Sequence, residues 1–314
     1  MSFGKKLTLQ DGTPIPQIGL GIWLSEPNEV ERAVEIAIRN GYRHLELACV
    51  CRRRGPVTDV DAVGRALKKV IPSVVKREEL FITGKLWNNA HRPAEVENQL
   101  DQTLQQLGLD YLDLFLMHFP VAFAPGQRDT PTDESGKAII DKDTTVLQTW
   151  RAMLVRPKSK VRNVGVSNFT TDVCKAVVSA TGQKPAANQV ESHPYLVQDE
   201  LIAYCKKEGI HLTAYSPLGN NRASFAARPR LTEHPVVKTA GVAMALGNEQ
   251  GTVQVRWKTH RQSHVLPRVS SSGPPPPSRR KAARSSLPAD IHTRGSSAVA
   301  RRVGFSPHRP RWRM

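Results

Sequence analysis

The sequence places ionisable side chains at the ends of three short apolar segments. Glu46 lies in "HLELA", Lys85 ends "LFITGK" and His118 ends "LDLFLMH". A carboxylate, an ammonium group and an imidazole that meet at one place can stabilise developing charge and support general acid–base catalysis. The segment "GYRHLELACVC" (41–51) adds a thiol, Cys51, five residues after Glu46. These residues are our first candidates for an active site.

The three segments belong to a longer alternation of apolar runs and amphipathic stretches. Short apolar runs bounded by turn residues are typical of parallel strands covered by helices. Seven such runs occupy 17–23, 44–48, 80–85, 112–118, 161–167, 187–191 and 211–216. Helical spacing of apolar residues follows in three stretches, at 26–41, 92–108 and 198–209. The alternation predicts an α/β fold, and a (β/α)8 TIM barrel fits it best.

The barrel is predicted to be incomplete at strand 8 and helix 8. "QSHVLPRVS" (262–270) is a thin candidate for the eighth strand, and no helical pattern follows it. An open doubly wound sheet is the alternative fold, although "GLGIW" lacks the third glycine of the G-x-G-x-x-G phosphate loop. We therefore expect a barrel over residues 1–270 and a disordered basic Pro/Arg/Ser-rich tail over residues 271–314.

The basic charge of the chain is concentrated near its end. The formal charge is +17, and the chain from Lys258 onward carries thirteen Lys and Arg against one acid, Asp290. Apart from Phe305 and Trp312, no aromatic residues are interleaved with these arginines, and no nucleic-acid-binding fold is predicted there, so we do not expect a nucleic-acid partner. The charge belongs to the predicted tail rather than to the barrel.

Cysteine usage and hydropathy bear on the location of the protein. Four cysteines at scattered spacings do not form a secreted disulfide framework, which favours a reduced, cytoplasmic setting. The start "MSFGKKLTLQDG" has no apolar run typical of a signal peptide, and no stretch has the length of a membrane span. Cys49 and Cys51 have no second cysteine pair nearby, so we expect no metal site. A monomer is the favoured state.

Seven motifs at the strand ends point to a known family. In chain order they are "GLGIW", "GYRHLELA", "FITGKLWN", "LDLFLMHFP", "KVRNVGVSNF", "NQVESHPYL" and "AYSPLG". With these motifs the chain resembles the aldo-keto reductases over about residues 7–240, and it looks most like the fungal reductases of small aldehydes and glycerol-type substrates. The resemblance implies NADPH-dependent reduction of a small-molecule carbonyl, an aldehyde or a ketone, to an alcohol. It does not identify the substrate.

The resemblance also assigns roles at the catalytic centre. In the family a Tyr donates a proton, a Lys lowers the pKa of that Tyr, an Asp pairs with the Lys, and a His holds the carbonyl oxygen. Lys85 and His118 match the Lys and the His, whereas Glu46 stands in place of the Asp and Cys51 in place of the Tyr. The Cys51 thiol ends one bond beyond Cβ and falls short of a phenol oxygen. Loss of a general acid typically costs about 10²–10⁴-fold in rate.

A second set of matches implies a cofactor site for NADPH. The polar residues that match the family's nicotinamide carboxamide ligands are Ser167, Asn168 and Gln189. Tyr215 matches the ring that stacks on the nicotinamide, and Ser216 and Leu218 match residues along the pyrophosphate. Arg268 is a weak stand-in for the residues that hold the 2′-phosphate.

The segment after Cys51 leaves other interpretations open. "CRRRGPVTDVDAVG" separates Cys51 from Gly64 by more residues than the family pattern has, and it contains three consecutive arginines. One interpretation is an anionic substrate, and another is a decayed or misannotated gene product. A third is a pseudoenzyme, a barrel that binds a dinucleotide or a partner without catalysis.

Overall fold

The computed structural model describes five stretches of the chain, all within residues 1–266, the first of two units into which the chain divides. The stretches are 5–22, 27–47, 59–126, 129–193 and 195–217. The predicted eighth strand (262–270) and the predicted tail (271–314) lie outside the described residues, so both stay predictions.

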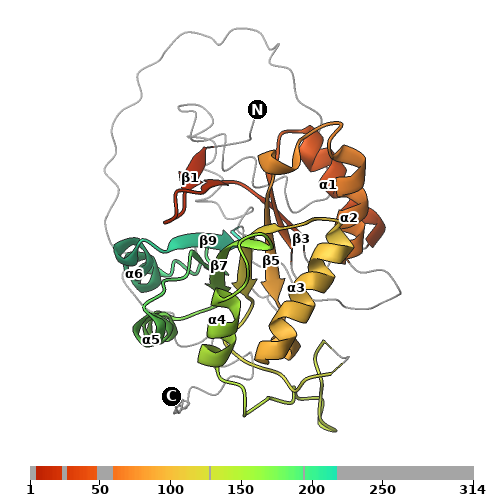
Figure 1. The fold of residues 1–314 in the computed structure, drawn as a ribbon. Helices are drawn as coiled ribbons and strands as arrows, with labels where there is room; N and C mark the ends of the chain where they lie inside the picture. Colours follow the sequence, from red (N-terminus) through yellow and green to blue (C-terminus); the bar gives the residue numbers. More distant parts are fainter. Residues whose placement is uncertain (1–4, 23–26, 48–58, 127–128, 194, 218–314) are drawn as a thin grey trace, which may run out of the picture. The chain divides into compact units, whose positions relative to one another are not determined.

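Seven parallel strands form one sheet in sequence order. They are β3 (Leu20–Ile22), β4 (His44–Leu47), β5 (Phe81–Leu86), β6 (Leu112–Met117), β7 (Val161–Ser167), β8 (Ala187–Glu191) and β9 (His211–Tyr215). The sheet curls into a half-barrel (Figure 1). All seven predicted strands are confirmed. The sequential order excludes the doubly wound alternative, in which the strand order reverses.

The helices lie around the outside of the curled sheet (Figure 1). They are α1 (Pro27–Arg39), α2 (Asp59–Val70), α3 (Pro93–Leu107), α4 (Val146–Leu154), α5 (Thr171–Thr181) and α6 (Asp199–Glu208). Short 3₁₀ turns, η1 (Arg77–Glu79) and η2 (Asn88–Ala90), flank β5. The main apolar core lies between sheet and helices and includes Val34, Leu67, Leu100 and Trp150. Among the described residues, these elements form seven strands of the predicted (β/α)8 barrel and the helices that cover them.

A hairpin that the sequence analysis did not predict packs against the interior of the sheet. It consists of β1 (Lys6–Thr8) and β2 (Pro14–Pro16), which pair antiparallel. The neighbouring side chains of Leu9 and Ile15 pack in one apolar cluster with Phe81, Leu114, Leu116 and Ala187. Because Phe81 and Ala187 begin their strands, this cluster fills the interior near the N-terminal ends of the strands.

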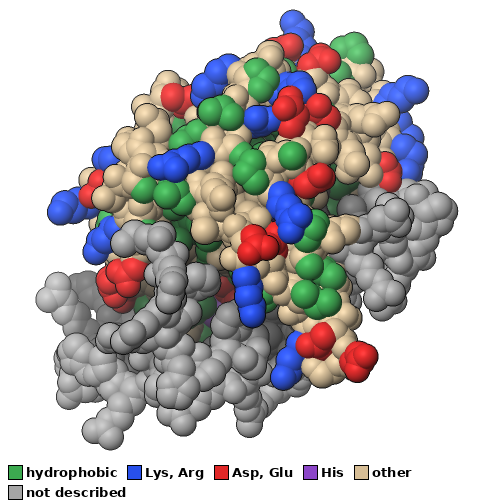
Figure 2. Space-filling view, turned by 60° about the horizontal axis from the view of Figure 1, so that its bottom comes forward, with side chains coloured by type: hydrophobic (Ala, Val, Ile, Leu, Met, Phe, Trp, Pro, Cys, Tyr) green, Lys and Arg blue, Asp and Glu red, His purple; other side chains and the backbone are tan. Residues whose placement is uncertain are grey.

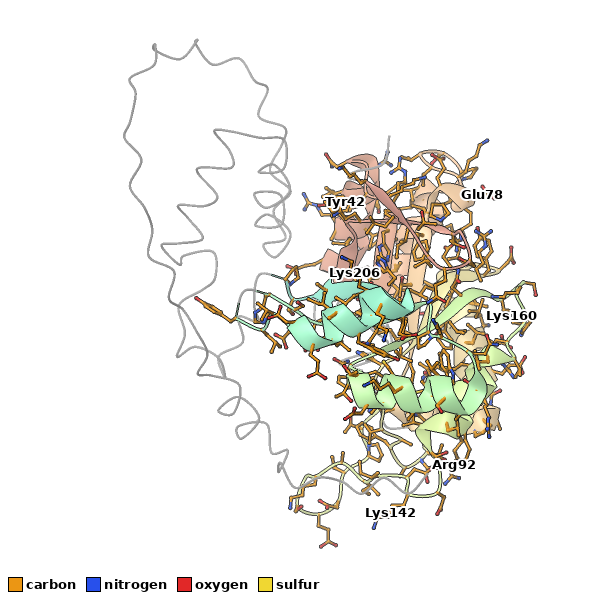
Figure 3. All side chains as sticks on the ribbon, turned by 90° about the vertical axis from the view of Figure 1, so that its left-hand side faces the viewer. Tyr42, Glu78, Arg92, Lys142, Lys160 and Lys206 are labelled. Carbon is orange, nitrogen blue, oxygen red and sulfur yellow. The ribbon has the colours of Figure 1, made fainter. Side chains whose placement is uncertain are left out.

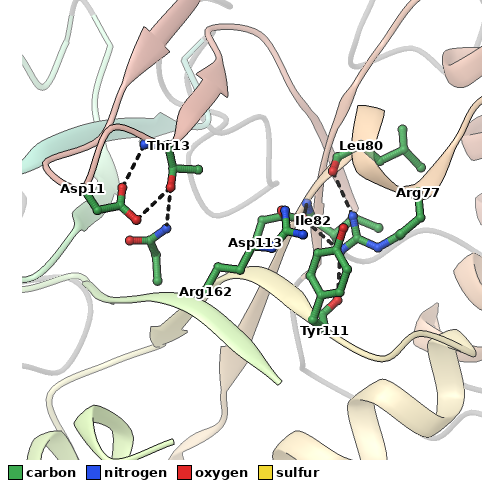
Figure 4. Close-up of polar contacts among 9 residues, drawn as sticks. Asp11, Thr13, Arg77, Leu80, Ile82, Tyr111, Asp113 and Arg162 are labelled. Atoms are coloured by element: carbon green, nitrogen blue, oxygen red, sulfur yellow. Dashed lines mark hydrogen bonds and ion pairs between the residues drawn. The ribbon is translucent and has the colours of Figure 1, made fainter. Parts of the chain in front are cut away.

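A buried carboxylate links three strands at this same end. Asp113 of β6 accepts hydrogen bonds from the backbone N–H of Ile82 (2.9 Å) and from the guanidinium groups of Arg77 (2.8 Å) and Arg162 (3.2 Å), as Figure 4 shows. The two guanidinium groups also lie 3.9 and 3.8 Å from the ring centroid of Tyr111. Polar links at the N-terminal end of a barrel serve stability, because the chemistry of this fold occupies the opposite end.

The two ends of the strands are well separated in the structure. Tyr42 and Glu78, which precede β4 and β5, lie at one end, whereas Arg92 and Lys142, which follow β5 and β6, lie at the other (Figure 3). On the face drawn in Figure 2, basic and acidic side chains of the described residues are interspersed. None of the described helices is long and apolar enough to cross a membrane.

Candidate active site

Glu46 and Lys85 form a partly buried ion pair at the C-terminal ends of β4 and β5. In the parallel register Glu46 lies opposite Thr83, so Lys85 is two residues further along and points to the same face. Lys85 Nζ donates to Glu46 Oε1 (2.9 Å) and to the carbonyl oxygen of Leu47 (3.0 Å). Lys85 is only 3% exposed. The 2.9 Å contact shows that a glutamate, one methylene longer than an aspartate, can pair closely with Lys85 at this position.

His118 follows β6 on the same face. Lys85 lies opposite Leu116 in the register, so His118 is the next residue along the chain on that face. Its ring packs edge-on against Trp87 (centroids 5.0 Å apart) and stacks on Phe119 (4.8 Å). Burial, and next the positive charge of Lys85, lowers the pKa of His118 to about 2. The imidazole is therefore neutral and can offer a single N–H.

A polar cluster occupies the ends of β7, β8 and β9. Ser167 Oγ donates to the carbonyl oxygen of Gln189 (2.8 Å), its partner in the parallel register. Asn168 adopts a left-handed backbone (φ 62°), which asparagine tolerates better than most residues. Tyr215 donates its hydroxyl hydrogen to Asn168 Oδ1 (2.9 Å). Four of the predicted site residues are thus brought together.

One hydrogen bond joins this cluster to His118. Asn168 Nδ2 donates to the carbonyl oxygen of His118 (2.9 Å). Burial, with contributions from the carboxylates of Glu191 and Glu46, raises the pKa of Tyr215 to about 12. The charge of Glu46 on β4 thus contributes to the raised pKa of Tyr215 on β9. These site residues all lie at or just beyond the C-terminal ends of their strands.

The remaining predicted site residues can be placed only in part. Ser216 directly follows β9 and has a positive φ of 47°. Cys51, Leu218 and Arg268 lie outside the described residues, so their predicted roles stay predictions. Among the residues that the structure describes, no group of three or more His, Cys, Asp or Glu could hold a metal ion.

The structure adds site residues that the sequence analysis missed. Trp87 and Phe119 enclose His118, and His91 is a buried histidine (1% exposed) whose pKa burial lowers to about 4. Trp87 and Phe119 lie within quoted motifs, but no spacing rule links them to His118. Nothing in "NNAHRP" indicates that His91 is buried, because its burial depends on packing by residues distant in sequence.

Comparison with known proteins agrees with this geometry. The model of the Aldo/keto reductase family matches residues 17–248, and the chain belongs to this family. The resemblance inferred from the seven motifs is confirmed.

Individual members of the family show which kinds of enzyme the chain is similar to. A D/L-glyceraldehyde reductase of Hypocrea jecorina is 49% identical over 254 residues, which cover 80% of this chain and 73% of that protein. A glycerol 2-dehydrogenase (NADP(+)) of Saccharomyces cerevisiae is 41% identical over 274 residues, covering 84% and 82%. Among solved structures, the aldose reductase from Schistosoma japonicum superposes with a TM-score of 0.64 at 36% identity, covering 71% and 73%. The two fungal relatives are named for the kinds of compound that the narrower resemblance predicts.

Proposed function

We propose that this protein reduces a small aldehyde or ketone to an alcohol with NADPH. The observation that carries the proposal is the pair of buried Lys85 with partly buried Glu46 beside a neutral His118, at the strand ends where barrel enzymes have their active sites. The fungal relatives named for glyceraldehyde and glycerol support a small, polar substrate.

The polar cluster fits the nicotinamide end of the cofactor. It combines hydroxyl and amide side chains with an aromatic ring, and a nicotinamide presents a flat ring with a carboxamide. Ser167, Asn168 and Gln189 would hold the carboxamide, and the ring of Tyr215, oriented by its hydrogen bond to Asn168, would stack on the nicotinamide. NADPH, when bound, supplies the hydride. We propose Ser216 and Leu218 for the pyrophosphate and Arg268 for the 2′-phosphate, which distinguishes NADPH from NADH.

The residues of the chain then act on the carbonyl oxygen. A carbonyl that accepts hydride develops negative charge on oxygen, and preorganised donors stabilise that charge. The neutral imidazole of His118 donates its N–H to the oxygen. Two hydrogens of the Lys85 ammonium group are used by Glu46 and Leu47, and the third remains for the reacting groups. Glu46 holds the ammonium group in place.

The proton that completes the alcohol must come from another group. Cys51 stands at the position of the family's tyrosine, and we propose that its short side chain makes proton transfer slow. The expected consequence is a low rate rather than loss of cofactor binding, because none of the residues assigned to the nicotinamide is changed.

The test compares NADPH oxidation by the full chain and by Cys51→Tyr with a panel of small aldehydes that includes D- and L-glyceraldehyde. We expect Cys51→Tyr to raise kcat by about 10²–10⁴-fold. Cys51→Phe supplies the ring without the hydroxyl and should give no such gain. Full activity in the unaltered chain would contradict the proposed loss of the proton donor.

Cofactor binding separates the remaining alternatives. Quenching of protein fluorescence by NADPH without turnover in either protein would favour the non-catalytic binding protein. Absence of both binding and turnover would overturn the proposed function. The same titration with NADH tests the preference for a 2′-phosphate.

We further propose that the protein is a cytoplasmic monomer that acts on a small-molecule carbonyl. Gel filtration with light scattering tests whether it is a monomer.

A further inference from the structure

The chain that follows His118 forms a loop that returns to its own start. Its described residues are 119–126 and 129–141, which we call the β6 loop. The N–H of Asp141 donates to the carbonyl oxygen of Ala122 (3.0 Å), and the N–H of Ala124 donates to the carbonyl oxygen of Ile139 (2.8 Å). The end of the β6 loop at Asp141 is therefore bonded to the residues just after His118.

The carboxylate of Asp141 holds this end of the loop against a neighbouring element. Its side chain is 3% exposed, and Oδ2 accepts hydrogen bonds from Arg92 Nε (2.8 Å) and from the hydroxyl group of Thr144 (2.9 Å). Oδ1 accepts from the backbone N–H of Asp143 (3.1 Å). Arg92 is the N-cap residue of α3, the helix that follows β5 and η2. The ion pair thus joins the connection after β6 to the connection after β5.

Two further hydrogen bonds join the β6 loop to the connection after β5. The N–H of Phe123 donates to the carbonyl oxygen of Asn88 in η2 (2.8 Å). The indole N–H of Trp87 donates to the carbonyl oxygen of Asp129 (2.6 Å). The position of the loop therefore determines where the indole group of Trp87 is held.

The ring of Trp87 also packs against the candidate active site. Its centroid lies 5.0 Å from that of His118, 6.2 Å from that of Phe119 and 6.1 Å from that of Phe123. Phe119 stacks on His118 in turn, with centroids 4.8 Å apart. Closely packed side chains transmit displacements to their neighbours. A shift of the β6 loop would therefore move the aromatic rings that enclose His118.

We infer that Asp141 is a positioning residue for the substrate side of the active site. Its ion pair with Arg92 fixes the β6 loop, and the loop fixes Trp87 and Phe119 around His118. Asp141 does not touch the reacting atoms in this arrangement. The inference rests on the proposed function only in that the region beside His118 is assigned to the substrate carbonyl.

The first test is the ¹H–¹⁵N NMR signal of the Trp87 indole group in the full chain. The chain has five tryptophans, so the signal is identified by its loss in Trp87→Phe. We expect Asp141→Asn and Arg92→Gln each to shift this signal and to speed its hydrogen exchange, because the bond to Asp129 is weakened. Lys142→Gln is the matched control. It removes a positive charge from an exposed residue next to Asp141, at the same end of the molecule as Arg92 (Figure 3).

The second test is the rate of NADPH oxidation with D- and L-glyceraldehyde, measured in the full chain and in Cys51→Tyr. We expect Asp141→Asn and Arg92→Gln to lower kcat/KM for the aldehyde by about 10-fold, since misplacement of a site by about 1 Å can cost about 10²-fold. The KM for NADPH should stay the same, because the residues assigned to the nicotinamide lie at the ends of β7, β8 and β9. The double variant should be no worse than Asp141→Asn alone, because both substitutions remove one interaction.

The two tests separate this inference from the proposed function. An unchanged Trp87 signal, or turnover with an unchanged kcat/KM for the aldehyde, would overturn the role of Asp141. The same loss in Lys142→Gln would also overturn it. If Asp141→Asn does not fold, Arg92→Gln decides the question, because the Arg92 side chain is 48% exposed. The expected change of the Trp87 signal without NADPH oxidation by any of the proteins would support the positioning of Trp87 and remove the proposed function.

Discussion

In the ion pair between Glu46 and Lys85, Lys85 is buried and Glu46 is partly buried, with side chains 4% and 16% exposed. Removing one partner of a buried pair leaves an uncompensated charge, which typically costs about 3–5 kcal/mol. We expect Glu46→Gln to lower the free energy of unfolding by about 3 kcal/mol, because the Lys85 ammonium group, on a side chain only 4% exposed, loses its carboxylate partner. Urea unfolding followed by circular dichroism measures this change.

A double-mutant cycle isolates the pair from other effects of the substitution. We expect Glu46→Gln combined with Lys85→Met to be less destabilised than the sum of the two single variants, since the double variant buries no unpaired charge. Glu35→Gln is the control, because Glu35 pairs with the exposed Lys69 at the surface and such pairs contribute little. Additive effects at Glu46 and Lys85 would contradict a coupled pair.

Buried histidines make the stability of the protein depend on pH. Burial lowers the pKa of His44, of His91 to about 4 and of His118 to about 2, below the unfolded value of about 6.5. The unfolded chain therefore binds more protons as the pH falls. Stability from these groups is complete above pH 6.5 and is lost toward the folded pKa, by up to about 1.4 kcal/mol per pH unit for each histidine.

We expect the free energy of unfolding to fall between pH 6.5 and 4.5, and to fall less steeply in His91→Phe, which lacks one of these groups. Urea unfolding at a series of pH values measures the slope. Asp141, whose pKa the Arg92 guanidinium lowers, contributes stability that is lost only below its usual pKa of 3.8, outside this range. Equal slopes in the two proteins would contradict the prediction.

At the scale of elements, helices α2 and α3 touch at a glycine. An added Cβ on Gly64 of α2 would collide with the backbone carbonyl oxygen of Gln106 in α3. A backbone atom cannot move aside as a flexible side chain can, so the two helices would have to separate. We expect Gly64→Ala to lower the free energy of unfolding by about 3 kcal/mol, at the upper end of overpacking costs.

The control for Gly64 is Gly21→Ala on β3. No atom lies within 4 Å of an added Cβ at Gly21, and its backbone does not require glycine. We expect the unfolding midpoint of Gly21→Ala to stay the same or rise slightly, because alanine restricts the unfolded chain. A small effect of Gly64→Ala in the same urea experiment would mean that α2 and α3 pack less closely than described.

The sequence predicts the strands better than it predicts the helices. Strand ends carry polar residues after continuous apolar runs, and this pattern alone is enough to locate Lys85 and His118. Apolar spacing does not predict helix α4, although Thr145 and Gln148 form a capping box at its start. It does not predict helix α5 either, although Thr170 caps the first turn of that helix. Capping signals of one or two residues are short, and packing decides whether they start a helix.

The sequence predicts which residues lie in the site where family motifs identify them. It does not predict which side chains enclose them, because that depends on packing. The pairing of Glu46 with Lys85 follows from strand register, since alternate residues of neighbouring strands share a face. The enclosure of His118 and the burial of His91 depend on η2, α4 and the segment after β6 coming together. Those contacts join residues too far apart in sequence for any local pattern to reveal.

At the scale of the whole molecule, the composition predicts where the folded barrel ends. The family match extends to residue 248, whereas the chain from Lys258 onward holds thirteen basic residues and one acid. Like charges repel and few apolar residues are available there, so this segment is expected to add little to folding. In the described sheet β9 is an edge strand, and unpaired edges are a liability that natural proteins cover.

The composition of the predicted tail and the edge position of β9 in the described sheet predict different effects of two truncations of the chain. A chain that ends at residue 270 should keep the unfolding temperature of the full chain, because it retains the whole family match and loses only the predicted tail. A chain that ends at residue 217 lacks residues 218–248, which the family model matches, and should unfold at a lower temperature or aggregate. Differential scanning calorimetry of the three chains measures the effect. A large loss on removal of residues 271–314 would contradict the boundary at residue 270 and assign that segment to the folded protein.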